Sequence, residues 1–176
     1  MKDISLHIMD ILQNSTRAKA TVIELLVEED EQNDKLILKF TDNGTGMSQE
    51  TLEKVLNPFF TTRTTRKVGL GLSLIKQNAE QTGGSLEIES ELGKGTVVTV
   101  TFGLSSIDRP PMGDLAGTVV LTASAYPDVR FIVNYKNSKV DYVFDTQEIN
   151  EALDGISIQE PEIIQYLTEM FRENIA

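Results

Sequence analysis

The chain contains no cysteine and a single histidine among its 176 residues. The absence of cysteine excludes disulfide bonds, thiol catalysis and thiolate metal ligands. Structural zinc sites draw their ligands mainly from cysteine and histidine, and one histidine cannot supply them. We therefore expect neither a disulfide framework nor a zinc centre.

Long hydrophobic runs and an excess of positive charge are also missing. Charged residues interrupt every apolar run well short of the roughly 20 residues that a membrane-spanning helix needs, and the amino terminus lacks the apolar core of a signal peptide. The net charge is −11, whereas proteins that bind nucleic acid usually concentrate Lys and Arg on one face. We expect a soluble, cytoplasmic protein that binds neither membranes nor nucleic acid.

Two glycines at alternate positions follow the apolar run Leu36–Phe40, in the segment Asp42-Asn43-Gly44-Thr45-Gly46-Met47. Glycine lets the backbone approach a ligand closely, and the Asp42 carboxylate could accept a hydrogen bond from an exocyclic amine of a base. Asp-Asn-Gly is also common in plain turns. Taken alone, the segment leaves a binding loop and an ordinary loop equally open.

Residues 3–18 carry apolar side chains at helical spacing and are predicted to form an amphipathic helix. The same helix has a polar stripe, because His7, Asp10, Asn14 and Arg17 recur at intervals that place them in one narrow sector at about 100° per residue. A carboxylate, an amide and a guanidinium therefore line up on this helix.

Turn and cap signals predict the elements that follow. Strands are expected at 21–27 and 36–40, helices at 49–56 and 70–81, and a hairpin of 86–90 with 96–102 around Gly93-Lys94-Gly95. This mixture predicts an α+β fold in which helices cover a largely antiparallel sheet, that is, a two-layer α/β sandwich.

Five segments occur in a fixed order within residues 1–104: Asp10–Ala18, Asp42–Met47, Asn57–Thr62, Gly69–Leu72 and Gly93–Thr96. They resemble the N, G1, F and G2 boxes and the closing GxGT of the GHKL ATPase superfamily, which includes histidine-kinase ATP domains, gyrase, mismatch-repair ATPases and the ninety-kilodalton heat-shock chaperones. The resemblance implies the Bergerat ATP-binding fold, with ATP and Mg²⁺ as ligands. The short lid looks most like the histidine-kinase branch.

Histidine kinases carry their phosphoacceptor on a dimerisation hairpin upstream of the ATP domain, and only six residues precede His7 here. The resemblance is therefore to a stand-alone form that lacks the dimerisation helices. We expect His7 to have a structural role and not to accept phosphate.

The resemblance assigns roles to three residues of the first helix. Asn14 matches the Asn that ligates Mg²⁺, with a buried amide as the structural alternative. Arg17 matches a basic residue that holds phosphate, with a surface ion pair as its alternative. Asp10 stands where some family members carry a Glu general base. This shorter carboxylate is either a catalytic residue for attack on the γ-phosphate or an acceptor that positions Asn14 or Arg17.

The resemblance places adenine against the glycine segment. Asp42 would accept a hydrogen bond from the adenine amine, and Thr96 would complete the recognition of the base. Gly44 and Gly46 would let the loop fold against the base, and Met47 would supply an apolar wall.

The implied ATP lid lies between Thr62 and Gly69. Arg63, Arg66 and Lys67 are its candidate triphosphate contacts. Gly69 and Gly71 are expected to open a helix whose first N–H groups favour phosphate.

Residues 105–176 lie outside the resemblance and are predicted to form an α+β extension. It should contain a helix capped by Asp114, a hairpin of 129–135 with 140–144 and a helix beginning at Pro161. The apolar stripe of the last helix is expected to dock on this hairpin, with a homodimer or partner contact as the alternative. No catalytic constellation is recognisable in the extension.

Two interpretations of function stay open. As a protein kinase or an ATPase, the protein would pass the γ-phosphoryl group of Mg·ATP to a partner protein or to water. As a non-catalytic switch or interaction module, it would bind ATP, order its lid and thereby alter a surface that a partner reads.

Overall fold

The computed structural model describes residues 2–57 and 66–176, with the backbone alone described for residues 66–70. Its strands are β1 (Val22–Asp30), β2 (Lys35–Asp42), β3 (Ser85–Glu91), β4 (Gly95–Gly103), β5 (Arg130–Lys136) and β6 (Asp141–Asp145). They form one sheet in the order β3-β4-β2-β1-β5-β6. Neighbouring strands are antiparallel except for β1 and β5, which are parallel.

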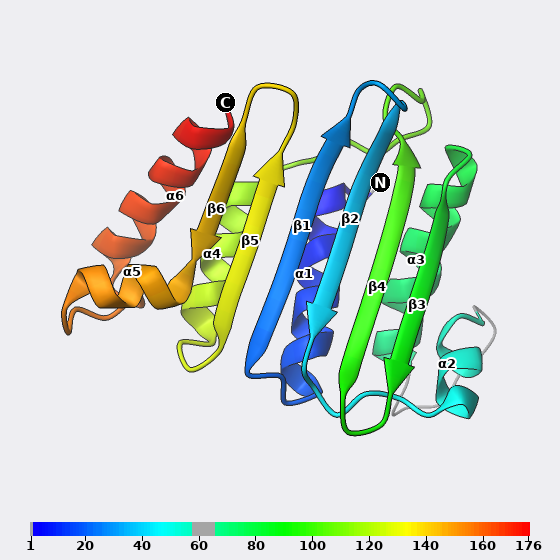
Figure 1. The fold of residues 1–176 in the computed structure, drawn as a ribbon, viewed down its shortest axis with the longest axis horizontal. Helices are drawn as coiled ribbons and strands as arrows, with labels where there is room; N and C mark the ends of the chain where they lie inside the picture. The colour runs from blue at the N-terminus through cyan, green and yellow to red at the C-terminus, as the bar shows by residue number, and fades with distance from the viewer. Residues whose placement is uncertain (1, 58–65) are drawn as a thin grey trace.

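The helices of the described residues are α1 (Ile4–Arg17), α2 (Gln49–Val55), α3 (Arg66–Gln81), α4 (Leu115–Ala125), α5 (Thr146–Leu153) and α6 (Pro161–Ile175). In Figure 1, α1, α3 and α4 lie behind the sheet, while α6 runs beside β6 and α2 lies near the end of β3. This arrangement of one sheet and one helical layer confirms the predicted α+β sandwich.

Period-two burial explains why the helices cover only one face. Leu25 and Val27 of β1 and Leu36 and Leu38 of β2 are at most 2% exposed and point towards the helices. Buried side chains of α1, α3 and α4 meet them in one continuous core. The burial of apolar surface between these layers is the main force that holds the sandwich together.

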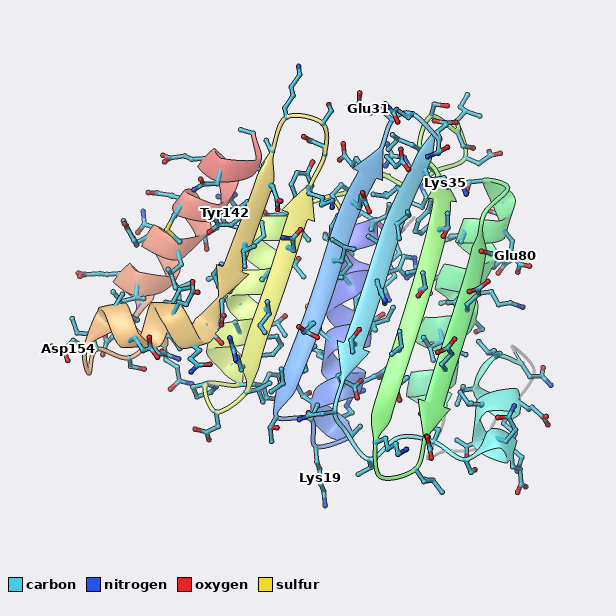
Figure 2. All side chains as sticks on the ribbon, in the orientation of Figure 1. Lys19, Glu31, Lys35, Glu80, Tyr142 and Asp154 are labelled. Atoms are coloured by element: carbon cyan, nitrogen blue, oxygen red, sulfur yellow. The ribbon has the colours of Figure 1, made fainter. Side chains whose placement is uncertain are left out.

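The opposite face of the sheet carries charged and polar side chains, and no described helix crosses it in Figure 2. Basic and acidic residues alternate from strand to strand there, because Lys39 lies on β2, Glu24 and Glu28 on β1, and Lys136 on β5. Lys136 and Glu28 form an ion pair at 3.9 Å. The alternation explains how an antiparallel sheet can expose this face to water.

The hydrogen bonds that begin the helices agree with the sequence. Asp3, Ser48, Asp114 and Asp145 each accept a hydrogen bond from a backbone N–H in the first turn of α1, α2, α4 and α5. Each satisfies a donor that the helix leaves unpaired. The predicted bounds of α1 and α2 are confirmed to within two residues, and the predicted start of α4 after Asp114 is confirmed.

Two predicted bounds are wrong. The first strand was predicted to end at residue 27, but β1 continues to Asp30 because its last residues pair with the start of β2, Asp30 with Lys35. The prediction began the third helix at Leu70, but α3 begins four residues earlier, at Arg66. Gly69 and Gly71 therefore lie within the helix.

Residues 105–176 continue the sheet and the core. The backbone of β5 pairs with β1 along seven residues, from Val22 with Arg130 to Glu28 with Lys136. At the edge of the sheet, the ring of Phe171 from α6 meets that of Tyr142 from β6, with centroids 5.1 Å apart. The last helix thus docks on the hairpin of its own chain, as expected. The predicted domain boundary at residue 104 stays a prediction.

The extension also holds the start of α1. The N–H of Ile4 donates to the carbonyl of Pro111 at 2.9 Å, and the N–H of Ser5 donates to that of Met112 at 2.8 Å.

Within the described ranges, no helix combines the length and the apolar character that crossing a membrane requires.

Candidate functional site

A cavity of about 270 Å³ opens between α1, α2, α3 and the sheet. We call it the base cavity. Its apolar wall consists of Ile11, Ala18, Met47, Val55, Leu72, Ile88 and Val98. Its other lining residues are Asn14, Ser15, Arg17, Asp42, Thr45, Gly46, Thr51 and Thr96. An apolar cavity with a few convergent polar groups is the usual form of a small-molecule site.

The glycine segment 42–47 is fixed by close backbone contacts with the β3–β4 hairpin. Gly46 has a φ of +71°, and a Cβ atom there would lie 2.1 Å from the carbonyl oxygen of Glu91. A Cβ atom on Gly95, at a φ of +127°, would lie 2.0 Å from the carbonyl oxygen of Asp42. Only glycine fits either position, so the sequence requires the loop and the hairpin to touch.

Hydrogen bonds join the same loop to three neighbouring segments. The N–H of Thr45 donates to the carbonyl of Ala18, at the end of α1, and the N–H of Gly93 donates to the carbonyl of Thr45, both at 2.8 Å. The side-chain oxygen of Asn43 accepts from the N–H groups of Thr21 and Val22 at 2.8 and 3.0 Å. The loop is therefore preorganised.

The Asp42 carboxylate is oriented by two donors. The Ser15 hydroxyl donates to its Oδ2 at 2.6 Å, and the N–H of Gly44 donates to its Oδ1 at 2.9 Å. Each carboxylate oxygen can accept a second hydrogen bond. Asp42 thus lines the cavity with accepting capacity left for the amine of a base.

A second network connects the loop to Thr96. The Ser90 hydroxyl accepts from the N–H of Met47 at 2.8 Å and lies 2.8 Å from the hydroxyl of Thr96 and 3.0 Å from the carbonyl of Gly95. The single hydroxyl proton of Ser90 serves one of these last two oxygens. Ser90 therefore sets the position of both Met47 and Thr96.

A smaller hollow of about 230 Å³ adjoins the base cavity, and Asn14 and Arg17 line both. We call it the polar cleft. Lys2, Asp10, Gln13, Gly71 and Leu74 complete its lining. Charged groups of both signs meet here, beside an apolar cavity. The pair of hollows matches the two ends of a nucleotide, an apolar base and a polyanion.

Asn14 has the chemistry of a Mg²⁺ ligand. Its side-chain oxygen lies 3.5 Å from the Nη1 atom of Arg17, a distance at which a hydrogen bond is weak. The oxygen is therefore available to a hard cation, which takes oxygen ligands and is often bound by one protein group together with phosphates and water. No cluster of three acidic or histidine side chains suited to a metal occurs among the described residues.

Asp10 lies one helical turn before Asn14, and its carboxylate forms an ion pair with the ammonium group of Lys2. The two side chains are 32% and 36% exposed. Among the described residues, no hydrogen bond joins Asp10 to Asn14 or Arg17. The predicted structural alternative, in which Asp10 orients those residues, thus has no such contact to support it.

His7 is buried beneath the polar stripe and is 1% exposed. Its Nε2 atom lies 2.8 Å from the side-chain nitrogen of Asn78, and its Nδ1 atom has no partner among the described residues. Burial, together with the nearby Lys2, lowers the pKa of His7 to about 4 against the opposing effects of Asp10 and Asp3. A neutral, buried imidazole is consistent with the expected structural role.

The predicted lid contacts fall outside what the structure describes. Arg63 lies in the undescribed range, and the side chains of Arg66 and Lys67 are not described. Gly69 lies in α3. Gly71 lines the polar cleft, but it lies in the interior of α3 and not at its first turn, so its predicted role at a helix N-terminus is wrong.

Sequence analysis missed Ser15, Ser90 and Lys2. Ser15 had a usable signal, because it falls on the apolar face of α1, where a buried hydroxyl needs a partner. Ser90 and Lys2 reach the site through the folding of distant segments, and neither belongs to a recognisable motif.

Another hollow, with a volume of about 400 Å³, lies between the α4–β5 turn and α5. Arg130, which is the basic residue of its lining, already forms two hydrogen bonds with Asp145, at 3.1 and 2.7 Å. This pairing lowers the pKa of the Asp145 carboxyl. The hollow is open and shares no lining residue with the base cavity, so we take the base cavity as the candidate site.

The fold and the paired hollows define a nucleotide-binding class of α/β sandwich, and comparison with known proteins specifies the family. Residues 2–106 match the model of the histidine kinase-, DNA gyrase B- and HSP90-like ATPases. The chain therefore belongs to this family.

Similar curated proteins are bacterial sensors and kinases. The chain is 36% identical over 103 residues to a putative sensor protein of Shewanella frigidimarina, a match that covers 57% of this chain and 16% of that protein. It is 35% identical over 99 residues to sporulation kinase D of Bacillus subtilis, with 56% and 19% covered. Sensor protein SrrB of Staphylococcus aureus is 34% identical over 96 residues, with 52% and 16% covered. The chain thus spans less than a fifth of these relatives.

A solved structure, the N-terminal domain of a DNA repair protein, shares the fold with a TM-score of 0.57 at 14% identity. The superposition covers 82% of this chain and 52% of that chain. The shared fold therefore extends beyond the region that the family model matches.

Proposed function

We propose that this protein binds Mg·ATP, with adenine in the base cavity and the phosphates in the polar cleft. The observation that carries this proposal is a single cavity lined by Asn14, Asp42 and Thr96. These residues belong to three segments that lie far apart in the sequence. Family membership supports it, because ATP is the ligand that the family's description implies.

Each lining residue has a role in this proposal. Asp42, held by Ser15 and the Gly44 N–H, accepts a hydrogen bond from the adenine amine, while Met47 and Thr96 border the base. Asn14 offers its side-chain oxygen to Mg²⁺, and Arg17 offers charged donors to phosphate. A bound Mg²⁺ ion supplies neutralisation of phosphate charge.

We further propose that the γ-phosphoryl group passes to a partner protein or to water. Asp10 would then orient the attacking hydroxyl or water as it loses its proton. The names of the relatives, which include a kinase and sensor proteins, favour a protein acceptor.

A non-catalytic switch is the second candidate, and the ion pair between Asp10 and Lys2 favours it. A carboxylate engaged by an ammonium group has fewer free acceptor positions for a water or a hydroxyl. In this case ATP binding alone would change the lid and the surface that a partner reads.

Calorimetric titration with ATP, ADP and GTP tests the binding proposal. We expect the wild-type protein to prefer the adenine nucleotides by at least about tenfold, and Asp42→Asn to lose most of that preference, because an amide donor then meets the adenine amine. Asp30→Asn is the matched control, since Asp30 lies at the far end of β1. Equal affinities for ATP and GTP in the wild type would overturn the assignment of Asp42.

Transfer of label from γ-labelled ATP separates the enzyme from the switch. With the enzyme, release of ADP or labelling of a protein in cell extract should fall by about 10²-fold or more in Asp10→Asn. Turnover that is no greater in the wild type than in this variant, despite ATP binding in both, supports the switch.

A further inference from the structure

The polar cleft contains a cation that the ATP-binding proposal does not use. Lys2 and Arg17 both line the cleft, and Arg17 alone has been assigned to phosphate. The ammonium group of Lys2 lies instead on Asp10.

Lys2 is placed in the cleft by contacts that do not involve its side chain. The carboxylate of Asp3 accepts hydrogen bonds from the N–H of Leu6 and the hydroxyl of Ser5, at 2.9 and 2.7 Å. The N–H groups of Ile4 and Ser5 donate to carbonyls of residues 111 and 112, at 2.9 and 2.8 Å. The backbone next to Lys2 is therefore tied both to α1 and to the extension, and its side chain is directed at the cleft from a fixed base.

The ion pair between Lys2 and Asp10 can open at low cost. Each side chain is about one-third exposed, and ion pairs of this kind contribute little to stability because water screens them. The lysine stem is flexible and its ammonium has three donors. A terminal phosphate presents more negative charge and more acceptor oxygens than one carboxylate.

We propose that Lys2 is a specificity-determining residue that contacts the terminal phosphate of ATP and thereby distinguishes ATP from ADP. The inference rests on the proposed function, because it requires a nucleotide whose phosphates occupy the polar cleft. Without a terminal phosphate, Lys2 stays on Asp10. When a terminal phosphate enters the cleft, the ammonium group transfers to it and the Asp10 carboxylate is released.

The exchange couples two events in one cleft. Asp10 becomes free of its cation only when a γ-phosphate is present, so a carboxylate able to orient a water or a hydroxyl is exposed at the moment when there is a group to attack. Lys2 is thus a positioning residue for Asp10 as well as a ligand contact for the phosphate.

Calorimetry with ADP and with a non-hydrolysable ATP analogue, both with Mg²⁺, tests the inference. In Lys2→Met we expect the affinity for the analogue to fall by about five- to tenfold and that for ADP by less than about twofold. Lys2→Arg should retain most of the preference for the ATP analogue over ADP. Lys76→Met is the matched control, because Lys76 is also 36% exposed and pairs with a carboxylate, that of Glu80, at 3.8 Å.

A double-mutant cycle of Lys2 and Asp10 measures a coupling between the two residues in binding the ATP analogue. A purely structural role of Lys2 would not produce this coupling. In the Asp10→Asn background no ion pair has to open before Lys2 reaches the phosphate. The loss of affinity for the ATP analogue that Lys2→Met causes should therefore be larger in that background than in the wild type, by about twofold or more. Thermal unfolding of every variant checks that the fold is intact.

The outcomes separate the two proposals. A wild type that binds neither nucleotide overturns the proposed function. Binding of both nucleotides, with the ratio of affinities unchanged in Lys2→Met, overturns the role of Lys2 alone. Equal losses for ADP and the analogue also overturn it, because the contact would then not be with the terminal phosphate.

Discussion

At the scale of single residues, the site depends on buried polar side chains that orient the side chains proposed to bind the ligand. Ser15 is 4% exposed and donates its hydroxyl to Asp42 across 27 positions of the sequence. Although Ser15 lines the base cavity, its hydroxyl proton is committed to the carboxylate. A hydroxyl of this kind acts by limiting the rotation of the group that binds.

Ser15→Ala is expected to weaken ATP binding about two- to fivefold, because the Asp42 carboxylate loses one of its two orienting donors. Stability should change by less than about 1 kcal/mol, since alanine favours the helix while Asp42 can turn to water. Calorimetry and thermal unfolding measure the two effects. Thr16→Ala is the control: its hydroxyl bonds within α1, to the carbonyl of Gln13 at 2.7 Å, and its loss should leave affinity unchanged.

His7 predicts a pH dependence of stability. Its pKa is about 4 in the folded protein against an ordinary value of 6.5, so between these two pH values the unfolded chain binds more protons. The stabilisation is complete above pH 6.5 and is lost as the pH falls towards 4. From pH 7 to pH 5, the free energy of unfolding should drop by about 2 kcal/mol through His7.

Urea unfolding at several pH values checks this effect. His7→Gln, which does not titrate and can still bond Asn78, should flatten the dependence between pH 7 and pH 5. A dependence as steep in the variant as in the wild type would assign the effect to other groups.

At the scale of elements, the sequence predicted what local signals encode. Caps at Ser48 and Asp114, helical spacing of apolar residues and period-two alternation placed most helices and strands correctly. The parallel pairing of β1 with β5 was not predictable, because both strands alternate as an antiparallel strand would and their pairing joins residues more than 100 positions apart. The early start of α3 at Arg66 was missed because two glycines suggested a helix terminus there.

The site shows the same division. Asp42, Gly46 and Thr96 were predictable because glycines at fixed spacing mark a close backbone approach. The position of Lys2 was not predictable, because no motif or spacing in the neighbouring sequence indicates that its side chain faces Asp10. That contact follows from hydrogen bonds between the start of α1 and residues 111 and 112.

The contact between the glycine loop and the β3–β4 hairpin gives a paired prediction. Gly46→Ala must move the backbone of Glu91, whereas Gly93→Ala, at a similar φ of +81°, meets nothing within 4 Å. We expect Gly93→Ala to cost about 1 kcal/mol for its backbone conformation and Gly46→Ala to cost at least about 2 kcal/mol. ATP affinity should fall about tenfold or more in Gly46→Ala alone, because the loop that carries Asp42 is displaced.

Denaturant unfolding and calorimetry measure both quantities on the two variants. Equal costs would mean that the strain of positive φ, and not the close approach, requires glycine at position 46.

At the scale of the whole molecule, residues 105–176 form part of the sandwich that carries the site. They add two strands to the sheet through β1, cover α1 with α4 and accept hydrogen bonds from the N–H groups of Ile4 and Ser5 at the start of α1. The family model matches residues 2–106 alone. Physically, the edge of that region at β1 is paired, and its helix α1 is covered, only when the extension is in place.

This continuity predicts a single unfolding transition. All four tyrosines lie in residues 105–176, so tyrosine fluorescence and near-ultraviolet circular dichroism of tyrosine report on the extension. Leu38 is fully buried on β2, outside the extension. Leu38→Ala should cost about 2–5 kcal/mol by leaving a cavity, and in one cooperative unit it should lower the midpoint of the tyrosine signal as much as that of the far-ultraviolet signal. A tyrosine midpoint that stays at the wild-type value, while the far-ultraviolet midpoint falls, would show that the extension folds as a separate domain joined at residue 104.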